Sequence, residues 1–443
     1  MKRWLVLIPT VATLLGFAIP ARPAVVETST TAIQHVVVIL KENRSYDSYF
    51  GQFPNAAGST TGTMSNGTIV DLTQHPTPEP LNHDIGHSLS DFNTAYDGGK
   101  LDKFDLEKNA IFNGVNNAYT QMSESQIPNY WQYARTYALA DNLFSDYKGS
   151  SFGNNLFFYA AQSGREDPAL AFRGVLGLPK PPKGQSLNTW WGCDDPVGTT
   201  VQMLGSDGTK AKVFPCFGFQ GLPNILAANG VSWKVYAPLG DHSNLHNVLD
   251  AISPVRNDPA LWGNDVALSN FVNDAANGTL PDVSWVATTQ TEHPTQLACT
   301  GENETVSYVN AVMNGPLWSS TAIFVVWDEW GGFYDHVPPP QIDNYSYGFR
   351  VPMLIISPWT KYGVSSNGGY VEHTFLSHSS ILKFIEDNWG LPALTARDAG
   401  ANNIMDAFDF TQTPKPTLTL TSRTCPALTA AQQASANSAG GED

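Results

Sequence analysis

Two uninterrupted apolar runs, each followed at once by acidic side chains, place the strongest constraint on how this chain can fold. Residues 36–40, VVVIL, precede the polar segment 41–44, KENR, and residues 321–327, TAIFVVW, precede Asp328 and Glu329. Short runs of this kind are typical of strands buried on both faces of a parallel sheet. In open α/β sheets, ligands bind beyond the carboxyl ends of the strands. The two runs therefore predict an α/β fold with a site at this edge.

The first run has a plainer alternative interpretation. Residues 41–44 could form a charged turn between a strand and a helix, with Ser45 or Asp47 as the N-cap. The stretch 35–51 alone does not decide between a site and such a turn.

The composition predicts a large core and argues against one class of partner. The chain has 443 residues, of which 42% are hydrophobic and 11% aromatic, so it can form one large α/β domain with insertions or two smaller domains. Its net charge of -16 argues against a non-specific nucleic-acid binder, which needs a basic face to neutralise phosphates. Residues 165–225, rich in Pro, Gly and Trp, predict a loop-rich insertion, and residues 411–443 predict a mobile tail.

Residues 1–24 have the pattern of a secretory signal peptide. Lys2 and Arg3 precede an apolar run over residues 4–19, and small residues and prolines follow it. A membrane anchor is the alternative, but the run is short and is interrupted by Pro9. We therefore expect a secreted protein, extracellular or periplasmic.

Export makes the four cysteines interpretable as disulfide partners. Cys193 and Cys216 flank a Gly-rich excursion and form a local pair in the simplest arrangement, which leaves Cys299 to pair with Cys425. Four cysteines permit three connectivities, and the sequence leaves all three open.

Ser151 stands at the predicted start of a helix. It lies in the Gly-bounded segment 149–155, GSSFGNN, ahead of the apolar run 156–161. The N–H groups and the dipole at a helix start favour a bound phosphate or a developing alkoxide. Ser151 is therefore a candidate nucleophile, and an ordinary N-cap serine is the alternative.

Several histidines could supply proton transfer. Residues 81–89, LNHDIGHSL, place His87 close to Asp84, and His293 follows the predicted strand 283–287. His242 and His336 lie in other polar segments. An imidazole can protonate a departing alcohol near neutral pH.

The adjacent carboxylates of Asp328 and Glu329 predict a bound cation, because both stay ionised easily only beside positive charge. A divalent metal ion suits their oxygens together with Glu42 and Asn43, and it could lower the pKa of Ser151. Metal, serine and imidazole together predict a phosphomonoester or phosphodiester hydrolase.

Periodicity adds expectations about other elements. Tyr130, Tyr133 and Tyr137 have helical spacing within residues 126–140, and residues 247–275 also predict an amphipathic helix. Residues 377–389 predict a helix ended by Gly390. Residues 351–356 predict another buried strand with the layout of the first two.

Five ordered motifs carry a resemblance to a known family. The segments are ENRSYDSYFG, GSSFGNN, DEWGGFYDHV, GFRVPMLIISP and HSSILKFIEDNWGLP. They resemble the bacterial phospholipase C and acid phosphatase family of phosphoesterases, within the alkaline-phosphatase-like superfamily, over residues 34–410. The resemblance implies a doubly wound, mostly parallel sheet sandwiched by helices.

The resemblance also implies roles for particular residues. Glu42, Asn43, Asp328 and Glu329 would hold the metal together with Ser151, which would be phosphorylated during turnover. His87 and His293 best match the family histidines that bind phosphate and protonate the leaving group, whereas His242 and His336 match less well.

The implied activity is hydrolysis of a phospholipid or a small phosphate ester through a phosphoserine, with transient contact to a membrane surface. An acid phosphatase acting on phosphomonoesters is the alternative within enzymes. A secreted binding protein that keeps the fold without the chemistry is the alternative from another class. Metal identity, head group and oligomeric state stay open.

Overall fold

The computed structural model describes residues 28–81, 83–164, 174–185, 192–205, 207–238, 247–363, 369–430 and 432. The predicted signal peptide, His242 and part of the predicted insertion lie outside these ranges.

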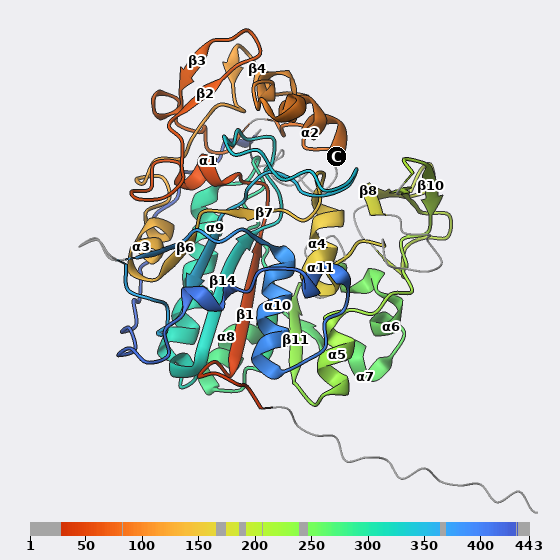
Figure 1. Cartoon of the computed structure of the whole chain (residues 1–443), viewed down its shortest axis with the longest axis vertical. Helices are drawn as coiled ribbons and strands as arrows, with labels where there is room; N and C mark the ends of the chain where they lie inside the picture. The colour runs from red at the N-terminus through yellow and green to blue at the C-terminus, as the bar shows by residue number, and fades with distance from the viewer. Residues whose placement is uncertain are drawn as a thin grey trace, which may run out of the picture.

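An eight-stranded sheet forms the centre of the molecule (Figure 1). From one edge to the other its strands are β12 (Asp265–Ala267), β11 (Trp233–Ala237), β13 (Val283–Ala287), β1 (His35–Lys41), β14 (Thr321–Trp327), β15 (Met353–Ile356), β6 (Ala138–Ala140) and β16 (Tyr370–Glu372). The apolar strand β1 lies between β13 and β14 and is parallel to both. The two runs that predicted buried parallel strands are therefore confirmed, and they are neighbours, so their carboxyl ends meet.

Strand β15 is the one antiparallel member of this sheet, because it runs against both β14 and β6. Residues 351–356 were expected to repeat the layout of β1. They contain a buried strand, but it runs in the opposite direction to β1, so the expected layout is wrong. The amino end of β15, preceded by Arg350, lies at the edge where β1 and β14 have their carboxyl ends. An apolar run shows burial but not strand direction, which depends on the connection that precedes it.

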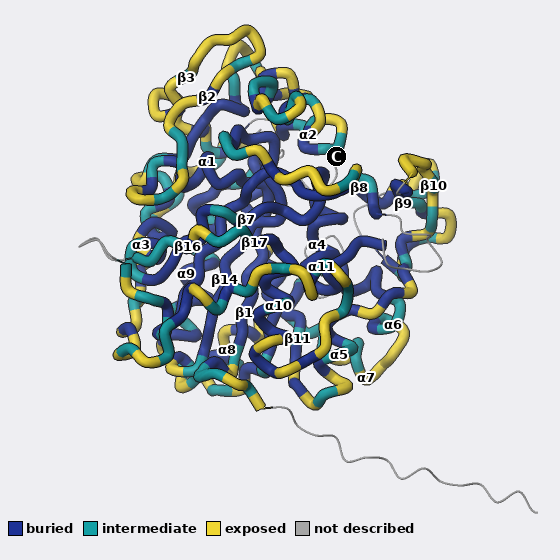
Figure 2. The backbone as a smooth tube through the Cα atoms, in the orientation of Figure 1, coloured by how far each residue is buried: buried dark blue, intermediate teal, exposed yellow. Residues whose placement is uncertain are grey.

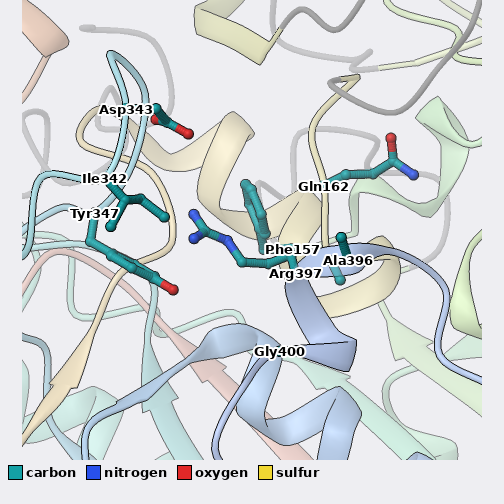
Figure 3. Close-up of a pocket in the computed structure, with 9 residues that line it drawn as sticks. Phe157, Gln162, Ile342, Asp343, Tyr347, Ala396, Arg397 and Gly400 are labelled. Atoms are coloured by element: carbon teal, nitrogen blue, oxygen red, sulfur yellow. The ribbon is translucent and has the colours of Figure 1, made fainter.

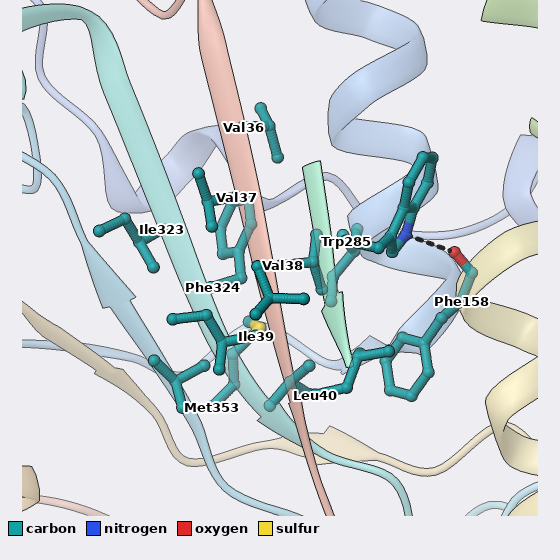
Figure 4. Close-up of a cluster of buried hydrophobic side chains, with 14 of the residues drawn as sticks. Val36, Val37, Val38, Ile39, Leu40, Phe158, Trp285, Ile323, Phe324 and Met353 are labelled. Carbon is teal, nitrogen blue, oxygen red and sulfur yellow. Dashed lines mark hydrogen bonds between the residues drawn. The ribbon is translucent and has the colours of Figure 1, made fainter. Parts of the chain in front are cut away.

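Helices cover both faces of the sheet, which confirms the α/β class and a mostly parallel sheet. In the register of β11 and β13, Val235 lies opposite Trp285, and Tyr236 lies opposite Val286, so Trp285 and Tyr236 point to different faces. Trp285 donates its indole N–H to the carbonyl of Phe158 in α4 (Ser151–Ala160) at 3.0 Å (Figure 4). Tyr236 packs edge-on against Phe271 of α8 (Asn270–Asn277) on the other face.

The remaining helices lie in these layers or beyond the carboxyl edge of the sheet (Figure 1). They are α1 (Tyr46–Phe50), α2 (Leu89–Tyr96), α3 (Pro128–Thr136), α5 (Leu222–Ala228), α6 (Ser253–Arg256), α7 (Pro259–Trp262), α9 (Ala298–Asn314), α10 (His378–Trp389) and α11 (Ala396–Ala399). Helix α10 packs against α4, and α9 packs against α8. The strands between the layers are buried, whereas exposed backbone concentrates at the periphery (Figure 2).

Two predicted helices differ from the structure. The helix expected over residues 126–140 ends at Thr136, and residues 138–140 form β6, because Tyr137 leaves the helical conformation. Residues 247–275 form short helices and strand β12 rather than one helix. Pro254, Pro259 and Gly263 interrupt that stretch, and proline lacks the N–H that a helix interior needs. The helix expected over 377–389 is confirmed as α10, with Gly390 as its left-handed C-cap.

Two peripheral segments stand at the carboxyl edge of the sheet. Strands β2 (Thr61–Thr63) and β3 (Ile69–Asp71), the pair β4 (Ile111–Phe112) and β5 (Val115–Asn116), and α2 lie above it (Figure 1). A three-stranded antiparallel sheet, β8 (Gly174–Lys180), β9 (Thr200–Leu204) and β10 (Lys210–Val213), lies beside α4. The short parallel pair β7 (Leu143–Phe144) and β17 (Leu376–Ser377) precedes α4 and α10.

Both disulfides of the local-pair arrangement are present, Cys193–Cys216 and Cys299–Cys425. The second bond joins α9 to the segment after residue 410. Lys415 donates to the carbonyl of Thr136 at 3.0 Å, and Asn303 donates to the carbonyl of Arg423 at 2.8 Å. These contacts hold residues 415–425 to the main fold, and residues 433–443 of the predicted mobile tail lie outside the described ranges.

Within the described ranges, no helix has the length and hydropathy needed to cross a membrane.

Candidate active site

Asp328 is the fully buried centre of the site. The backbone N–H of Asn43 donates to its Oδ1 at 3.0 Å, and that of Glu329 donates to the same atom at 2.8 Å. The side-chain amide of Asn155 donates to Oδ2 at 3.3 Å. The ends of β1 and β14 and the first turns of α4 therefore meet at this carboxylate. Burial raises its pKa to about 6, against the lowering effect of hydrogen bonds from Asn43 and Ser151.

Backbone shape brings the end of β1 close to the turn after β14. Asn43 has a φ of 60° and Gly331 a φ of 62°. A Cβ on Gly331 would lie 2.4 Å from the carbonyl oxygen of Asn43, so only glycine fits there. Gly331 in turn donates its N–H to Glu329 Oε2 at 2.8 Å. Gly331 thus allows the tight turn that follows β14.

Ser151 is the first residue of α4 and is almost fully buried. Its hydroxyl lies beside Asp328 and contributes to lowering the pKa of that carboxyl. Ser150 holds the N-cap position but makes no capping bond with its side chain. The first N–H groups of α4 therefore have no side-chain cap, and a helix start in this state suits an anion.

The histidines His87 and His293 lie on either side of Asp84. His293 Nε2 is 3.4 Å from Asp84 Oδ2, and His87 Nδ1 is 3.8 Å from the same oxygen. His87 Nε2 is 3.8 Å from Glu329 Oε1. Burial lowers the pKa of His293, but the charges of Asp84 and Glu42 outweigh it and raise the pKa overall. The predicted site residues thus form one connected cluster at the carboxyl edge of the sheet. They are Glu42, Asn43, His87, Ser151, His293, Asp328 and Glu329.

A buried ion pair that sequence reasoning missed supports His293. Lys41 Nζ lies 3.1 Å from Glu292 Oε1, and both side chains are fully buried. Tyr49 donates to Glu292 Oε2 at 2.8 Å, and Tyr130 donates to Oε1. Glu292 also has a φ of 72°, which turns the chain directly before His293. These partners are far apart in sequence, so no local pattern signalled them.

His336 belongs to a second cluster, with Asp47, Asp335 and Arg350. His336 Nδ1 lies 2.6 Å from Asp47 Oδ2. Arg350 donates to Asp335 at 2.9 and 3.0 Å and to Asp47 at 3.2 Å. The ligand atoms of the two aspartates and the histidine lie within 4.8 Å of one another, as in a metal site. The buried guanidinium already supplies the positive charge there, so we interpret this cluster as an ion network that joins α1 to β15.

The donor set around Asp328 fits a hard divalent cation. Glu42, Asn43, Asp328 and Glu329 are buried and supply carboxylate and amide oxygens. The side-chain Oδ1 and Nδ2 of Asn43 are buried and have no hydrogen-bond partner in the described part of the chain. A buried amide normally has partners, so this orphaned oxygen suits a role as a metal ligand.

Two cavities flank α4. One, of about 600 Å³, lies between α2 and the three-stranded sheet and includes Ser150 in its lining. The other, of about 360 Å³, lies by Phe157 and Tyr347, with Arg397 between them (Figure 3). Arg397 is paired with Asp146 at 3.0 Å, and Phe157 is roughly 9 Å along the helix from Ser151 at 1.5 Å per residue. The first cavity is therefore the one beside the candidate nucleophile.

A serine at a helix start, among buried acids and imidazoles at the carboxyl edge of an α/β sheet, is typical of enzymes that hydrolyse esters through a serine. The model of the Phosphoesterase family matches residues 33–392. The chain belongs to this family, which confirms the resemblance carried by the five motifs.

Curated relatives are named phospholipases C. The chain is 26% identical to the non-hemolytic phospholipase C of Burkholderia pseudomallei over 85% of this chain and 59% of that protein. It is 26% identical to phospholipase C B of Mycobacterium tuberculosis, over 87% of this chain and 79% of that protein. It is 25% identical to non-specific phospholipase C6 of Arabidopsis thaliana, over 86% and 73%. The chain therefore spans somewhat more than half of the Burkholderia protein. The family match confirms the predicted phosphoesterase family, and phospholipase C is the name of these relatives.

Proposed function

We propose that this protein is an exported, metal-dependent phosphoesterase that hydrolyses phosphate esters through a phosphoserine at Ser151. The observation that carries the proposal is the position of Ser151 at the uncapped start of α4, the helix whose Asn155 donates to buried Asp328 at 3.3 Å. The match to the Phosphoesterase family supports the same chemistry. Phospholipids are the first substrate class to test, because the relatives are named phospholipases C.

We also propose that the fold belongs to the alkaline-phosphatase-like superfamily. A mostly parallel sheet with helices on both faces and the nucleophile at a helix start supports this assignment. The two disulfides support export, since such bonds persist in oxidising compartments.

The first step follows from the positions of the residues. The N–H groups at the start of α4 hold the phosphoryl oxygens, and Ser151 Oγ attacks phosphorus after its proton has passed to solvent. The Oγ–P bond forms, the bond from phosphorus to the leaving oxygen breaks, and His293 or His87 protonates that oxygen. A divalent ion held by Glu42, Asn43, Asp328 and Glu329 would neutralise phosphoryl charge and lower the pKa of the serine.

The second step reverses these roles. The same imidazole, now neutral, takes a proton from water, whose oxygen attacks phosphorus and releases Ser151. Both ring nitrogens of His293 have partners, Asp84 at Nε2 and Thr295 at 3.1 Å from Nδ1, so Nε2 has to exchange Asp84 for the reacting oxygen when it transfers a proton. His87 is held at Nδ1 by the carbonyl oxygen of Ile85 at 2.7 Å, and its Nε2 points towards Glu329. His336 is part of the ion network around Arg350, and we propose a positioning role for it.

Replacing Ser151 by alanine tests the proposal. The purified protein should release phosphocholine from phosphatidylcholine or phosphate from an aryl phosphate, and Ser151→Ala should abolish both. The exposed Ser125→Ala is the matched control and should keep full activity. A Ser151→Ala variant that stays active would contradict the proposal, and release of phosphate from the monoester alone would identify an acid phosphatase.

A further inference from the structure

The cavity between α2 and the three-stranded sheet has an unusual charge. It is lined by Ser88, Leu89, Ser90, Asn93, Tyr147, Ser150, Leu176, Gly177, Leu178, Lys180, Thr200, Gln202, Lys210 and Lys212. Three of these side chains are lysines and none is acidic, although the chain as a whole has a net charge of -16. A basic cavity in so acidic a protein points to an anionic ligand.

Strand register places the lysines on one face of the small sheet. Lys212 lies opposite Gln202, Gln202 lies opposite Leu176, and Lys180 lies opposite Thr200. Lys210 is two residues before Lys212 and so shares its face. The other face, with Val201 and Met203, is buried in the main core. Within the described ranges, none of the three lysines has an acidic partner at ion-pair distance.

Ser150 connects this cavity to the candidate nucleophile. It lines the cavity, directly precedes Ser151, and is 1% exposed. Its hydroxyl is buried and has no hydrogen-bond partner in the described part of the chain. Gly177 of β8 lies across from it: a Cβ there would come 3.9 Å from Ser150 Oγ. A buried hydroxyl without a partner, on a residue that lines a cavity, is a group that a ligand would satisfy.

We propose that this cavity binds a second anionic group of the substrate, attached to the phosphate ester that reacts at Ser151. The preferred substrates are then phosphate esters that carry another phosphate or a carboxylate. Ser150 Oγ donates to the portion nearest the reacting phosphate, and Lys180, Lys210 and Lys212 attract the distal anion. This inference rests on the proposed phosphoesterase function and narrows its substrate class.

A matched set of soluble diesters tests the inference. The p-nitrophenyl phosphodiesters of ethanol, choline and 3-hydroxypropionate differ mainly in carrying a neutral, a cationic or an anionic substituent. The full-length protein should hydrolyse the anionic ester with a kcat/KM about tenfold above that of the ethyl ester, mainly through KM, and the choline ester should be poorer. This preference should shrink between low and high salt, since exposed charges are screened.

Replacing Lys180, Lys210 and Lys212 together by methionine should remove the preference and leave the ethyl ester within about twofold. The control is Lys383→Met, which lies on α10 outside the cavity and should keep the preference for the anionic ester. A wild-type protein that prefers the anionic substrate neither among the soluble diesters nor among the vesicles, or a triple variant that keeps the preference, would overturn the inference. The proposed function is tested separately: the wild type should hydrolyse the three esters, and Ser151→Ala should hydrolyse none of them.

Vesicles distinguish the source of the anion. Release from vesicles containing cardiolipin or phosphatidylinositol 4-phosphate is compared with release from phosphatidylcholine vesicles of equal surface charge. A lysine-dependent preference for the first two lipids identifies an anionic lipid head group. A preference confined to the soluble diesters supports the inference with a water-soluble ester as the substrate. No lysine-dependent preference in either arm contradicts it.

Discussion

At the residue scale, Gly331 determines whether the ends of β1 and β14 can meet. Its φ of 62° disfavours any side chain, and a Cβ at this position would come within 2.4 Å of the carbonyl oxygen of Asn43. We predict that Gly331→Ala displaces Asn43 and Asp328, lowers kcat/KM by at least tenfold, and destabilises the fold by about 2 kcal/mol or more. Urea unfolding and initial rates measure these effects.

Gly67 provides the control for this substitution. It has a φ of 80°, but a Cβ there meets nothing within 4 Å. Gly67→Ala therefore carries the conformational cost alone, roughly 1 kcal/mol, and should leave the activity unchanged. Equal activity losses in the two variants would show that the close approach at Gly331 does not matter.

The buried pair of Lys41 and Glu292 gives a second prediction. Glu292→Gln leaves the ammonium of Lys41 without its counter-charge in a fully buried position. We expect a loss of about 3–5 kcal/mol in stability, as for other broken buried pairs. The exposed pair of Lys383 and Asp387 is the control, and Asp387→Asn should change stability by less than 1 kcal/mol. Similar unfolding free energies for both variants would refute a supporting role for Glu292.

Much of the site could be predicted because its signals are local. The acids after β1 and β14 follow apolar runs, and Ser151 stands at a helix start, so pattern alone placed them. Glu292 and Arg350 were missed because their roles come from partners far along the chain, Lys41 and Asp47. Burial of both members of a distant pair leaves no periodic signal in the sequence.

At the scale of elements, burial was easier to predict than direction or length. The strand over residues 353–356 was expected, but its antiparallel direction depends on the loop that follows β14. Helix α3 ends at Thr136 because residues 138–140 are hydrogen-bonded to β15 as a strand. The helical pattern of residues 126–140 did not predict this end, because the pairing of residues 138–140 with β15 outweighs their helix propensity.

The contact between α10 and α11 makes stability depend on pH. Glu386 of α10 is buried, and burial together with Asp398 raises the pKa of its carboxyl to about 9 from an ordinary 4.5. Asp398 already accepts from Leu394 at 2.7 Å and Thr395 at 2.8 Å, so the proton stays on Glu386. The pKa of Glu386 is higher in the folded protein than in the unfolded chain. The contribution of protonated Glu386 to the stability of the fold is therefore complete below about pH 4.5 and is lost as pH rises towards 9.

Glu386→Gln should remove this dependence. Its amide can donate to Asp398 at every pH, so the variant should gain stability relative to the wild type as pH rises from 5 to 9, by up to about 1.4 kcal/mol per pH unit. Thermal or urea unfolding at several pH values measures the difference, with the exposed Glu124→Gln as control. Parallel pH profiles for the wild type and Glu386→Gln would contradict a protonated Glu386.

At the scale of the whole molecule, one edge of the sheet collects the parts that the proposed reaction needs. The core strands deliver the acids, α4 delivers the serine, and the segment over β2 to β5 and α2 covers the edge from above (Figure 1). The small sheet beside α4 adds a basic cavity to an acidic protein. The core thus supplies the chemistry, and the peripheral segments are placed to select the substrate.

The most direct test is to trap the phosphorylated enzyme. The purified protein is mixed with excess aryl phosphate or phosphodiester, quenched in acid during turnover, digested and analysed by mass spectrometry. We predict one phosphoryl group on the peptide that contains Ser151, absent from Ser151→Ala and reduced after chelator treatment that removes the bound metal. Rapid turnover with an unmodified Ser151, or a phosphoryl group on another residue, would contradict a phosphoserine mechanism at this site.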